Sequence, residues 1–350
     1  MPWPRASADA LVGRVLCGTY RVVQLLGSGG VGNVYLAERM GRHPHERLAL
    51  KVLRAEHTGS PAIVARFERE AEAAARLRHP HVLRVDRLER DGAVLCFAME
   101  LLLGLDLADT LTSARALQPA RAVRIALEAA GGLGAAHLEG VIHRDVKPEN
   151  LFLVHAPDGR ELVKVLDFGL SLLRNQPSAS QAAGRHLKPG AEACSNPPVG
   201  TPEYVAPEIV RGGQPSPASD VYALGIVLYE MLAGRAPFVG PTHAILEQHQ
   251  REPLPPLHRF HPGLLVSRDL DAVVKKALVK DPRARFATMT ELSANLLDTP
   301  EAREELARVN KPEPTPPARR SSPLGSVIDE PTSPPAATTA SSEGSIRVAK

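Results

Sequence analysis

Residues 143–150 read His-Arg-Asp-Val-Lys-Pro-Glu-Asn, and residues 167–169 read Asp-Phe-Gly. These two stretches decide the fold of the 350-residue chain, because together they supply a carboxylate, a lysine, an amide and a second carboxylate. That set suits phosphoryl transfer, which needs a nucleophile held in line and metal ions that neutralise the charge of a triphosphate. A full eight-residue motif followed at this distance by Asp-Phe-Gly arises by chance at well under roughly 1%.

Each of the four groups has a role in such a reaction. Asp145 can accept the proton of an attacking hydroxyl, and Lys147 can lie along the transferred phosphate. Asn150 and Asp167 can hold Mg²⁺, with Mn²⁺ as an alternative, because such ions prefer oxygen ligands. The set resembles the catalytic loop and metal-binding motif of eukaryotic-like (Hanks-type) protein kinases.

The resemblance implies an α+β, bilobal protein-kinase fold. The N-lobe is expected to be β-rich with one regulatory helix, and the C-lobe mainly α-helical. The apolar fraction of 43% suffices for a substantial core. The expected ranges are 1–15 for an N-terminal lead, 16–297 for the kinase domain (N-lobe 16–99, hinge 100–104, C-lobe 105–297) and 298–350 for a largely disordered, Pro/Ser/Thr-rich tail.

Hydrophobic periodicity predicts where strands and helices lie. The expected strands are at residues 20–26, 34–38, 48–53, 94–99, 151–154 and 162–166. The expected helices are at residues 61–77, 120–139, 219–234 and 270–278. Gly131, Gly132 and Gly134 weaken the second helix, where either a local interruption or a close helix contact would explain them.

The composition changes after about Val309. Residues 311–350 hold 8 prolines, 11 serines or threonines and no aromatic residue. Such a segment cannot bury enough apolar area to offset its ordering entropy, so a disordered tail is predicted. We favour an inert extension. The alternative is a phosphoacceptor or docking segment built on Thr315-Pro316, Ser322-Pro323 and Ser333-Pro334.

A glycine-rich stretch, residues 27–34, fits the pattern G-x-G-x-x-G-x-V. Gly27, Gly29 and Gly32 would let backbone amides approach phosphates without a side chain in the way. A dinucleotide-binding fold would place a helix directly after such a loop, whereas residues 34–38 predict a strand. The pattern therefore favours the kinase form, a hairpin that covers ATP.

One lysine, Lys51, stands in the apolar strand 48–53, and a buried lysine needs a partner. In the next helix Glu70 shares a face with the apolar residues Ile63 and Phe67, which predicts an inward ion pair. The resemblance implies that Lys51 is the partner of Glu70. Lys51 would hold the α- and β-phosphates while Glu70 orients it. An ordinary amphipathic helix that tolerates a glutamate is the alternative.

The resemblance also implies an apolar slot for adenine between the lobes. Leu26, Val34 and Ala49 would form its roof, Phe152 its floor and Met99 its back, while the backbones of Glu100 and Leu102 would bond the adenine edge. From composition alone these are core residues. Their assignment rests on their position relative to the motifs.

Residues 200–208, Gly-Thr-Pro-Glu-Tyr-Val-Ala-Pro-Glu, resemble the end of a kinase activation segment. The resemblance implies that Thr201 bridges Asp145 and Lys147. A lysine two residues after the catalytic aspartate matches serine/threonine kinases rather than tyrosine kinases. The expected catalytic residues are Asp145, Lys147, Lys51, Glu70 and Thr201.

The resemblance also implies structural or regulatory roles for other residues. Glu208 would pair with Arg285, and Asp220 would tie its helix to the backbone of the catalytic loop. Arg144, next to the catalytic aspartate, is tolerable when an anion neutralises it, and a phosphate on the activation segment would do so. We therefore hypothesise that Ser195 is autophosphorylated.

The bulk composition excludes several other classes. A net charge of +3 gives no reason to expect nucleic acid or an anionic membrane as a partner. Cys17, Cys96 and Cys194 show neither a disulfide framework nor a zinc-ligand spacing, so a reducing, cytoplasmic location fits. No signal core and no stretch of about 18 apolar residues is present, so no membrane span is expected.

The sequence thus predicts a bacterial serine/threonine protein kinase that uses ATP and Mg²⁺, phosphorylates proteins and autophosphorylates. Bacterial kinases of this type often activate as homodimers through the N-lobe, so the resemblance implies a second copy of the chain as a partner. Two alternatives remain open. One is a pseudokinase scaffold, supported only by the activation segment, residues 167–208, which is roughly ten residues longer than the resemblance leads one to expect. The other is a small-molecule phosphotransferase of similar fold.

Overall fold

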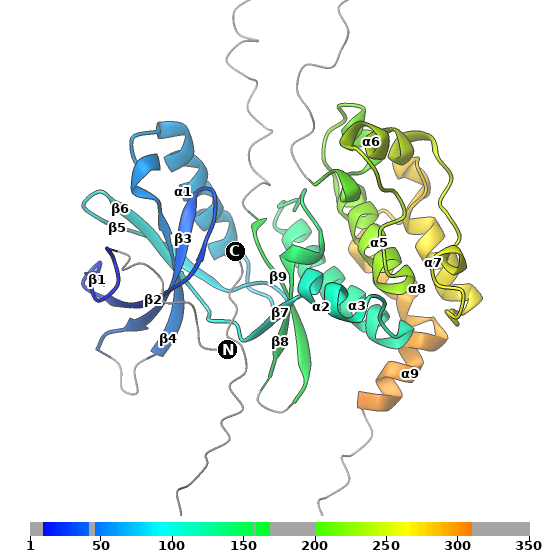
Figure 1. Cartoon of the computed structure of the whole chain (residues 1–350), viewed down its shortest axis with the longest axis horizontal. Coiled ribbons are helices and arrows are strands. Elements are labelled where there is room, and N and C mark those ends of the chain that lie inside the picture. Colours follow the sequence, from blue (N-terminus) through cyan, green and yellow to red (C-terminus); the bar gives the residue numbers. More distant parts are fainter. Residues whose placement is uncertain (1–9, 42–45, 157–158, 169–200, 310–350) are drawn as a thin grey trace, which may run out of the picture.

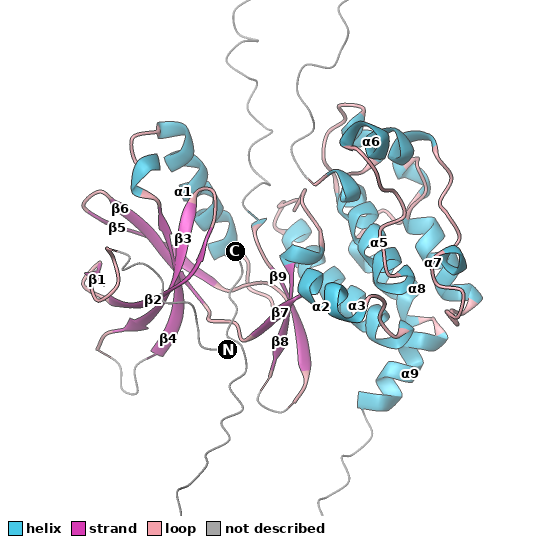
Figure 2. Cartoon of the chain, in the orientation of Figure 1, coloured by secondary structure: helices cyan, strands magenta, loops and turns pink. Residues whose placement is uncertain are grey.

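The computed structural model describes residues 10–41, 46–156, 159–168 and 201–309. Within them the chain forms two lobes (Figure 1), one built on a six-stranded sheet with a single long helix and one built mainly of helices. A three-stranded sheet lies between the large sheet and the helices (Figure 2). The expected α+β, bilobal architecture is thereby confirmed.

The N-lobe sheet is antiparallel throughout, with the strand order β1-β2-β3-β4-β6-β5. Its elements are β1 (Val15–Leu16), β2 (Tyr20–Ser28), β3 (Gly32–Arg39), β4 (Glu46–Leu53), α1 (Pro61–Arg76), β5 (Val85–Asp91) and β6 (Val94–Met99). The predicted strands and the helix are confirmed to within a few residues at their ends. The glycine stretch forms the β2–β3 hairpin, as expected.

Alternation along the strands gives this sheet two buried faces. One face packs against α1, where the rings of Phe67 and Phe97 lie 5.1 Å apart. The other face buries a second cluster that contains Tyr35, Leu50 and Cys96. Because both faces are covered, the sheet is a rigid support for the side chains that point toward α1.

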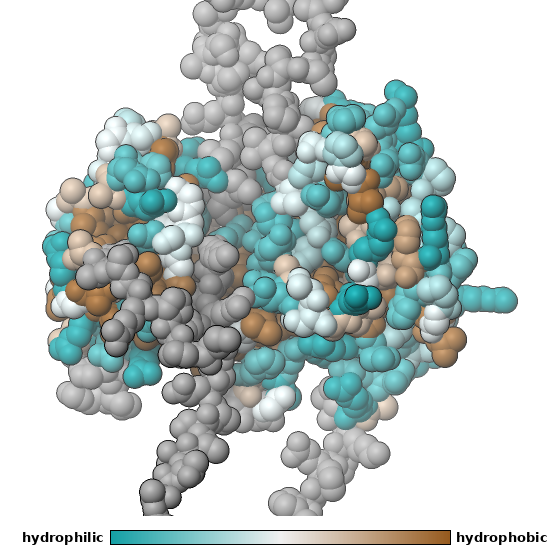
Figure 3. Space-filling model, in the orientation of Figure 1, coloured by the Kyte–Doolittle hydropathy of each residue, from teal (hydrophilic) through white to brown (hydrophobic). Residues whose placement is uncertain are grey.

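The C-lobe surrounds α5, which is buried on nearly every side. Hydrophilic side chains cover most of the helical lobe on the face shown in Figure 3. Its elements are β7 (Gly104–Asp106), α2 (Leu107–Ala114), α3 (Pro119–Leu138), β8 (Leu151–His155), β9 (Glu161–Val165), α4 (Pro207–Val210), α5 (Pro217–Ala233), α6 (Thr242–Arg251), α7 (Arg268–Ala277), α8 (Met289–Leu297) and α9 (Pro300–Val309).

The glycines of α3 reflect close contact rather than an interruption. The helix runs unbroken from Pro119 to Leu138. A Cβ atom at Gly132 would lie 2.5 Å from the carbonyl oxygen of His81, and one at Gly134 would lie 3.4 Å from Met289 Cβ. Gly132 therefore lets the loop that follows α1 sit directly on the helix.

Ordered structure extends beyond the predicted domain at both ends. The tail was expected to begin at residue 298, but helix α9 extends the ordered chain to Val309, where the composition changes. Ala302 of α9 is buried and Glu305 pairs with Arg124 of α3, so the helix is part of the C-lobe. The lead was expected to reach residue 15, yet the amide of Gly13 already donates to the carbonyl of Val22.

Candidate active site

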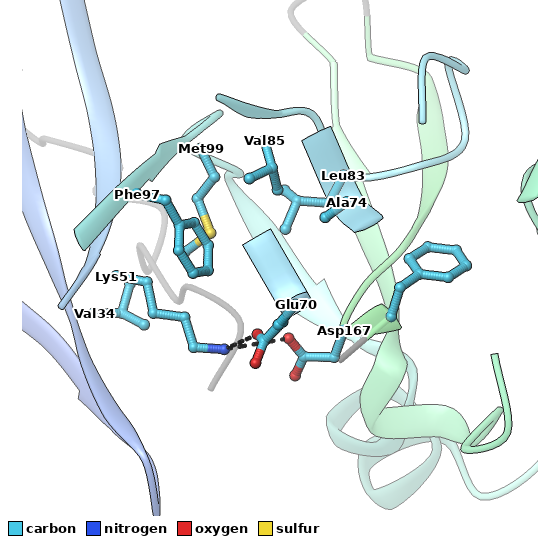
Figure 4. A pocket seen from close by; sticks show the side chains of 10 residues that line it. Val34, Lys51, Glu70, Ala74, Leu83, Val85, Phe97, Met99 and Asp167 are labelled. Carbon is cyan, nitrogen blue, oxygen red and sulfur yellow. Dashed lines mark hydrogen bonds and ion pairs between the residues drawn. The ribbon is translucent and has the colours of Figure 1, made fainter. Parts of the chain in front are cut away.

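Strand β4 and helix α1 bring Lys51 and Glu70 together, as predicted. The Nζ atom of Lys51 lies 2.5 Å from Glu70 Oε1 and 3.7 Å from Asp167 Oδ1 (Figure 4). Burial by itself would lower the pKa of the lysine, but the carboxylates of Asp167 and Glu70 outweigh it and raise the pKa. Lys51 is therefore a fixed cation held between two anions.

The catalytic loop places its polar groups around Asp145, whose side chain is almost fully buried. The Nζ atom of Lys147 is 2.8 Å from Asp145 Oδ2 and donates to Thr201 Oγ1 at 2.9 Å. The Nδ2 atom of Asn150 donates to the Asp145 carbonyl at 2.7 Å. Thr201, far away in sequence, thus joins the loop through the lysine, as the resemblance implied.

Asp220 of α5 holds the backbone of the catalytic loop in place. Its carboxylate accepts hydrogen bonds from the backbone amides of His143 and Arg144 at 2.8 and 2.9 Å. Arg144 and Asp167 both adopt positive φ, 71° and 51°. Such backbone is unfavourable for side chains other than glycine and persists where surrounding contacts hold it. The predicted role of Asp220 is confirmed.

A buried ion pair fixes the segment that follows Thr201 to the rest of the C-lobe. Arg285 binds Glu208 through two hydrogen bonds of 2.8 and 2.7 Å and also donates to the carbonyls of Val279, Lys280 and Ala218. Every donor is used, so this buried guanidinium is fully satisfied. The predicted pair of Glu208 and Arg285 is confirmed.

These groups open onto a cleft of about 490 Å³ between the lobes. Gly29 and Gly32 line it and close their hairpin with a 2.9 Å bond from the Gly29 amide to the Gly32 carbonyl. Gly27 lies further back, paired with Val34 across the hairpin. The other predicted residues at the cleft are Lys51, Glu70, Asp145, Lys147, Asn150 and Asp167.

An apolar pocket adjoins the lysine, and Figure 4 shows Phe97 and Met99 beside it. The predicted adenine residues Val34, Ala49, Met99, Leu102 and Phe152 belong to one buried cluster. Leu26 is only half-buried and lies outside that cluster. The side chain of Glu100 accepts hydrogen bonds from the Arg84 amide and from Lys164 Nζ, both at 2.7 Å.

Several cleft residues were not predicted from sequence. Arg66 of α1 lines the cleft, and its position four residues before Glu70, on the same helix face, was the available signal. Leu83 and Val85 line the apolar pocket, and no local pattern marks them. Ser195 lies outside the described residues.

The side chains of Asn150 and Asp167 suit a hard cation, because the amide and the carboxylate each supply an oxygen ligand. Within the described ranges no group of three His, Cys, Asp or Glu side chains could hold a metal. Mg²⁺ keeps water and substrate phosphates as ligands and needs few ligands from the protein.

The two lobes, the cleft and the assembled catalytic loop define the class of protein kinases. A model of the protein kinase domain matches residues 20–297, and the chain belongs to this family. The similar curated proteins reported below are serine/threonine-protein kinases of bacteria.

The comparisons with individual proteins agree. The chain is 38% identical over 289 residues to serine/threonine-protein kinase PknB of Mycobacterium leprae, covering 81% of this chain and 43% of that protein. It is 38% identical over 288 residues to PkaB of Streptomyces coelicolor, covering 81% and 63%. The crystal structure of the Mycobacterium tuberculosis PknI kinase domain matches with a TM-score of 0.58 and 29% identity, covering 83% and 98%.

The chain spans about half the length of the curated relatives it matches. Among the helices of the described ranges, none has the length and apolar character needed to cross a membrane.

Proposed function

We propose that the chain is an ATP-dependent serine/threonine protein kinase that transfers the γ-phosphate of ATP to protein hydroxyls. The observation that carries the proposal is the contact of Lys147 with both Asp145 and Thr201. This contact joins the proton acceptor to the segment that faces the substrate. Lys51, Asp145 and Asp167 are all present, whereas pseudokinase scaffolds usually lose one of them.

Lys51 and Glu70 prepare the cleft for the triphosphate. Lys51 stays protonated because the surrounding carboxylates raise its pKa, so it can bind the α- and β-phosphates. Glu70 fixes its direction from α1. The glycine-rich hairpin with Gly29 and Gly32 lines the cleft, and its glycines let the phosphates approach the backbone without a side chain in the way.

Asp145 and Lys147 act at the other end of the triphosphate. Asp145 would accept the proton of the serine or threonine hydroxyl. Lys147 would neutralise charge on the γ-phosphate during its transfer from ATP to that hydroxyl. Thr201 holds the lysine in this position through its hydroxyl. Asn150 and Asp167 would hold Mg²⁺, or Mn²⁺ in its place, which when bound neutralises the charge of the phosphates.

An open groove beside Thr201 favours a polypeptide as acceptor. It encloses about 530 Å³ between α2, α5 and the segment after Thr201, and Pro148, Tyr204 and Arg235 line it. The hydroxyl of Tyr204 donates to Glu230 at 2.7 Å and fixes one wall. A small-molecule phosphotransferase would have no need of this groove.

Phosphorylation of Ser195, and an N-lobe homodimer, remain predictions that belong to the same proposal. A phosphate on Ser195 would supply an anion for the activation segment. Mapping active protein and finding no phosphate at Ser195 would remove that part alone.

The first experiment is an autophosphorylation assay with ATP and Mg²⁺ on wild type and Asp145→Asn. We expect the variant to lose at least about 100-fold in rate, because it cannot accept the hydroxyl proton, while nucleotide binding and the unfolding midpoint stay close to wild type. Equal phosphate on both proteins would contradict the proposed base. Phosphate transfer to small hydroxylated molecules but to no protein acceptor would favour the other phosphotransferase class.

A further inference from the structure

Two free thiols of the N-lobe touch each other although 79 residues separate them in sequence. The Sγ atoms of Cys17 and Cys96 are 3.7 Å apart. A disulfide bond is about 2.05 Å long. The two sulfurs therefore need to approach by only about 1.7 Å to become bonded.

The backbone at Cys17 is unusual and directs its side chain inward. Cys17 and Gly18 form the turn between β1 and β2, with φ of 51° and 60°. Glycine, asparagine or aspartate normally fills such positions, so a cysteine there is unfavourable unless another contact holds it. The carboxylate of Asp91, at the end of β5, accepts a hydrogen bond from the Cys17 amide at 2.8 Å and holds the turn against the β5–β6 hairpin.

Cys96 is the fixed member of the pair. It is fully buried on β6, paired with Val52 of β4 on one side and Glu89 of β5 on the other. Movement falls to Cys17, which is half-buried in a turn at the edge of the sheet. Of the two cysteines, Cys17 is therefore the one that a small oxidant would meet first.

We propose that Cys17 and Cys96 are a reversible oxidation site that a peroxide closes to a disulfide. The Cys17 sulfur attacks one oxygen of hydrogen peroxide, the O–O bond breaks, and a sulfenic acid and water form. The Cys96 sulfur then attacks the sulfenic sulfur, forms the S–S bond and releases a second water. The two thiols give up two electrons, and one peroxide becomes two waters.

The surroundings of the pair make the reaction slow at neutral pH. Burial raises the pKa of the Cys17 thiol, and the charges of Glu89 and Asp91 raise it further, although the contact with Cys96 lowers it. The hydroxyl of Tyr20 faces the same region and donates to Glu89. Because the thiolate is the reacting form, the rate should rise about tenfold per pH unit until the pKa is reached.

The disulfide would fasten the sheet without reaching the active site. Cys96 and Val52 belong to the buried face opposite α1, whereas Lys51 points toward α1. Closing a loop of this length restricts the unfolded chain. We expect the oxidised protein to unfold about 5–10 °C higher and its autophosphorylation rate to change less than about twofold.

The test exposes the reduced full chain to hydrogen peroxide at pH 7 and pH 8.5, followed by alkylation and peptide mapping without reductant. We expect residues 15–21 linked to residues 91–115, one of the three thiols left for alkylation, and recovery of all three after dithiothreitol. Cys194→Ser is the matched control, which should keep the link. Cys17→Ser and Cys96→Ala should each lose it, together with the rise in unfolding midpoint.

Three outcomes of this experiment would contradict the proposed disulfide. Three alkylated thiols after peroxide treatment would overturn the proposal, as would a link that requires Cys194. Conversion of Cys17 to sulfinic acid while Cys96 stays a thiol would also overturn it. Because mass and thiol count are read without ATP, these outcomes are independent of kinase activity.

Discussion

At the scale of single residues, Lys51 keeps its charge only through its neighbours. Burial alone would lower its pKa, and Asp167 and Glu70 together reverse this effect. Replacing Glu70 with Gln removes one of the two anions, so the pKa of Lys51 should fall and the cation should be lost at a lower pH. We expect the alkaline limb of the kinase pH profile to move to lower pH in Glu70→Gln.

The profile of Lys51→Met serves as the control, since it has no ammonium to lose and should show only residual activity at every pH. Wild type and Glu70→Gln profiles that differ by a constant factor across the whole range would contradict this account.

His249 offers a stability test at the same scale. It is fully buried, contacts the hydroxyl of Tyr222 at 2.8 Å and the carbonyl of Glu203 at 3.0 Å. Burial and nearby Lys280 lower its pKa to about 4. An unfolded histidine binds a proton below about pH 6.5, but the folded one does not until about pH 4, so this contribution to stability is lost as the pH falls between these values.

We expect His249 to account for about 2 kcal/mol of the stability lost between pH 7.5 and 5. The measurement is denaturant unfolding of wild type and His249→Gln at several pH values. The variant should be less stable at pH 7.5 but should lose less on acidification. An identical pH slope in both proteins would show that His249 does not control this window.

At the scale of elements, two adjacent glycines in α3 make a matched pair. A Cβ at Gly132 would meet the His81 carbonyl at 2.5 Å, whereas one at Gly131 would meet side-chain atoms only, the nearest being His79 Cε1 at 3.4 Å. We expect Gly132→Ala to destabilise the protein by about 2–3 kcal/mol through this clash. Gly131→Ala should be neutral or stabilising by up to about 1 kcal/mol, because alanine favours the helix.

Chemical unfolding of both variants checks the prediction. Equal effects at the two positions would mean that helix propensity alone, rather than the approach of the His81 loop, explains the glycines. The kinase assay is a further readout, because that loop leads into β5 and the apolar pocket.

Elements with strong local patterns could be predicted, and those with charged or short patterns could not. Residues 94–99 form a strand with the bounds that the apolar run predicted. Its partner β5 was missed because charged side chains dominate residues 85–91, although Asp91-Gly92 is a hairpin signal. Helix α9 was not predicted because several of the residues that it buries are charged. Glu301 and Glu305 are buried because they have partners elsewhere in the C-lobe, which the local sequence does not show.

At the scale of the whole molecule, the motifs predicted the catalytic centre while tertiary packing determined its walls. Asp145, Lys147 and Asn150 are close in sequence, and their chemistry is visible there. Leu83 and Val85 reach the apolar pocket through the path of the chain after α1. Such contacts depend on the arrangement of two lobes, which no local window of sequence contains.

The end of the folded domain provides the last prediction. Helix α9 lies beyond the match to the family model, which ends at residue 297. Yet Glu301 accepts hydrogen bonds from the amide and hydroxyl of Ser267 at 2.7 and 2.8 Å, and Glu305 lies 3.1 Å from Arg124. Arg124 also bonds Glu161 of β9, so the helix connects to the strand that leads to Asp167.

We expect a chain ending after residue 309 to keep the stability and kinase activity of the full chain. A chain ending after residue 297 should lose about 3–5 kcal/mol, because removing α9 leaves the partly buried cation of Arg124 without one of its carboxylates and exposes the surface under Ala302. Denaturant unfolding and autophosphorylation of the two truncated chains test this. If both are as stable as the full chain, α9 contributes nothing and the domain ends where the family model does. If both are weakened, residues 310–350 are not an inert extension.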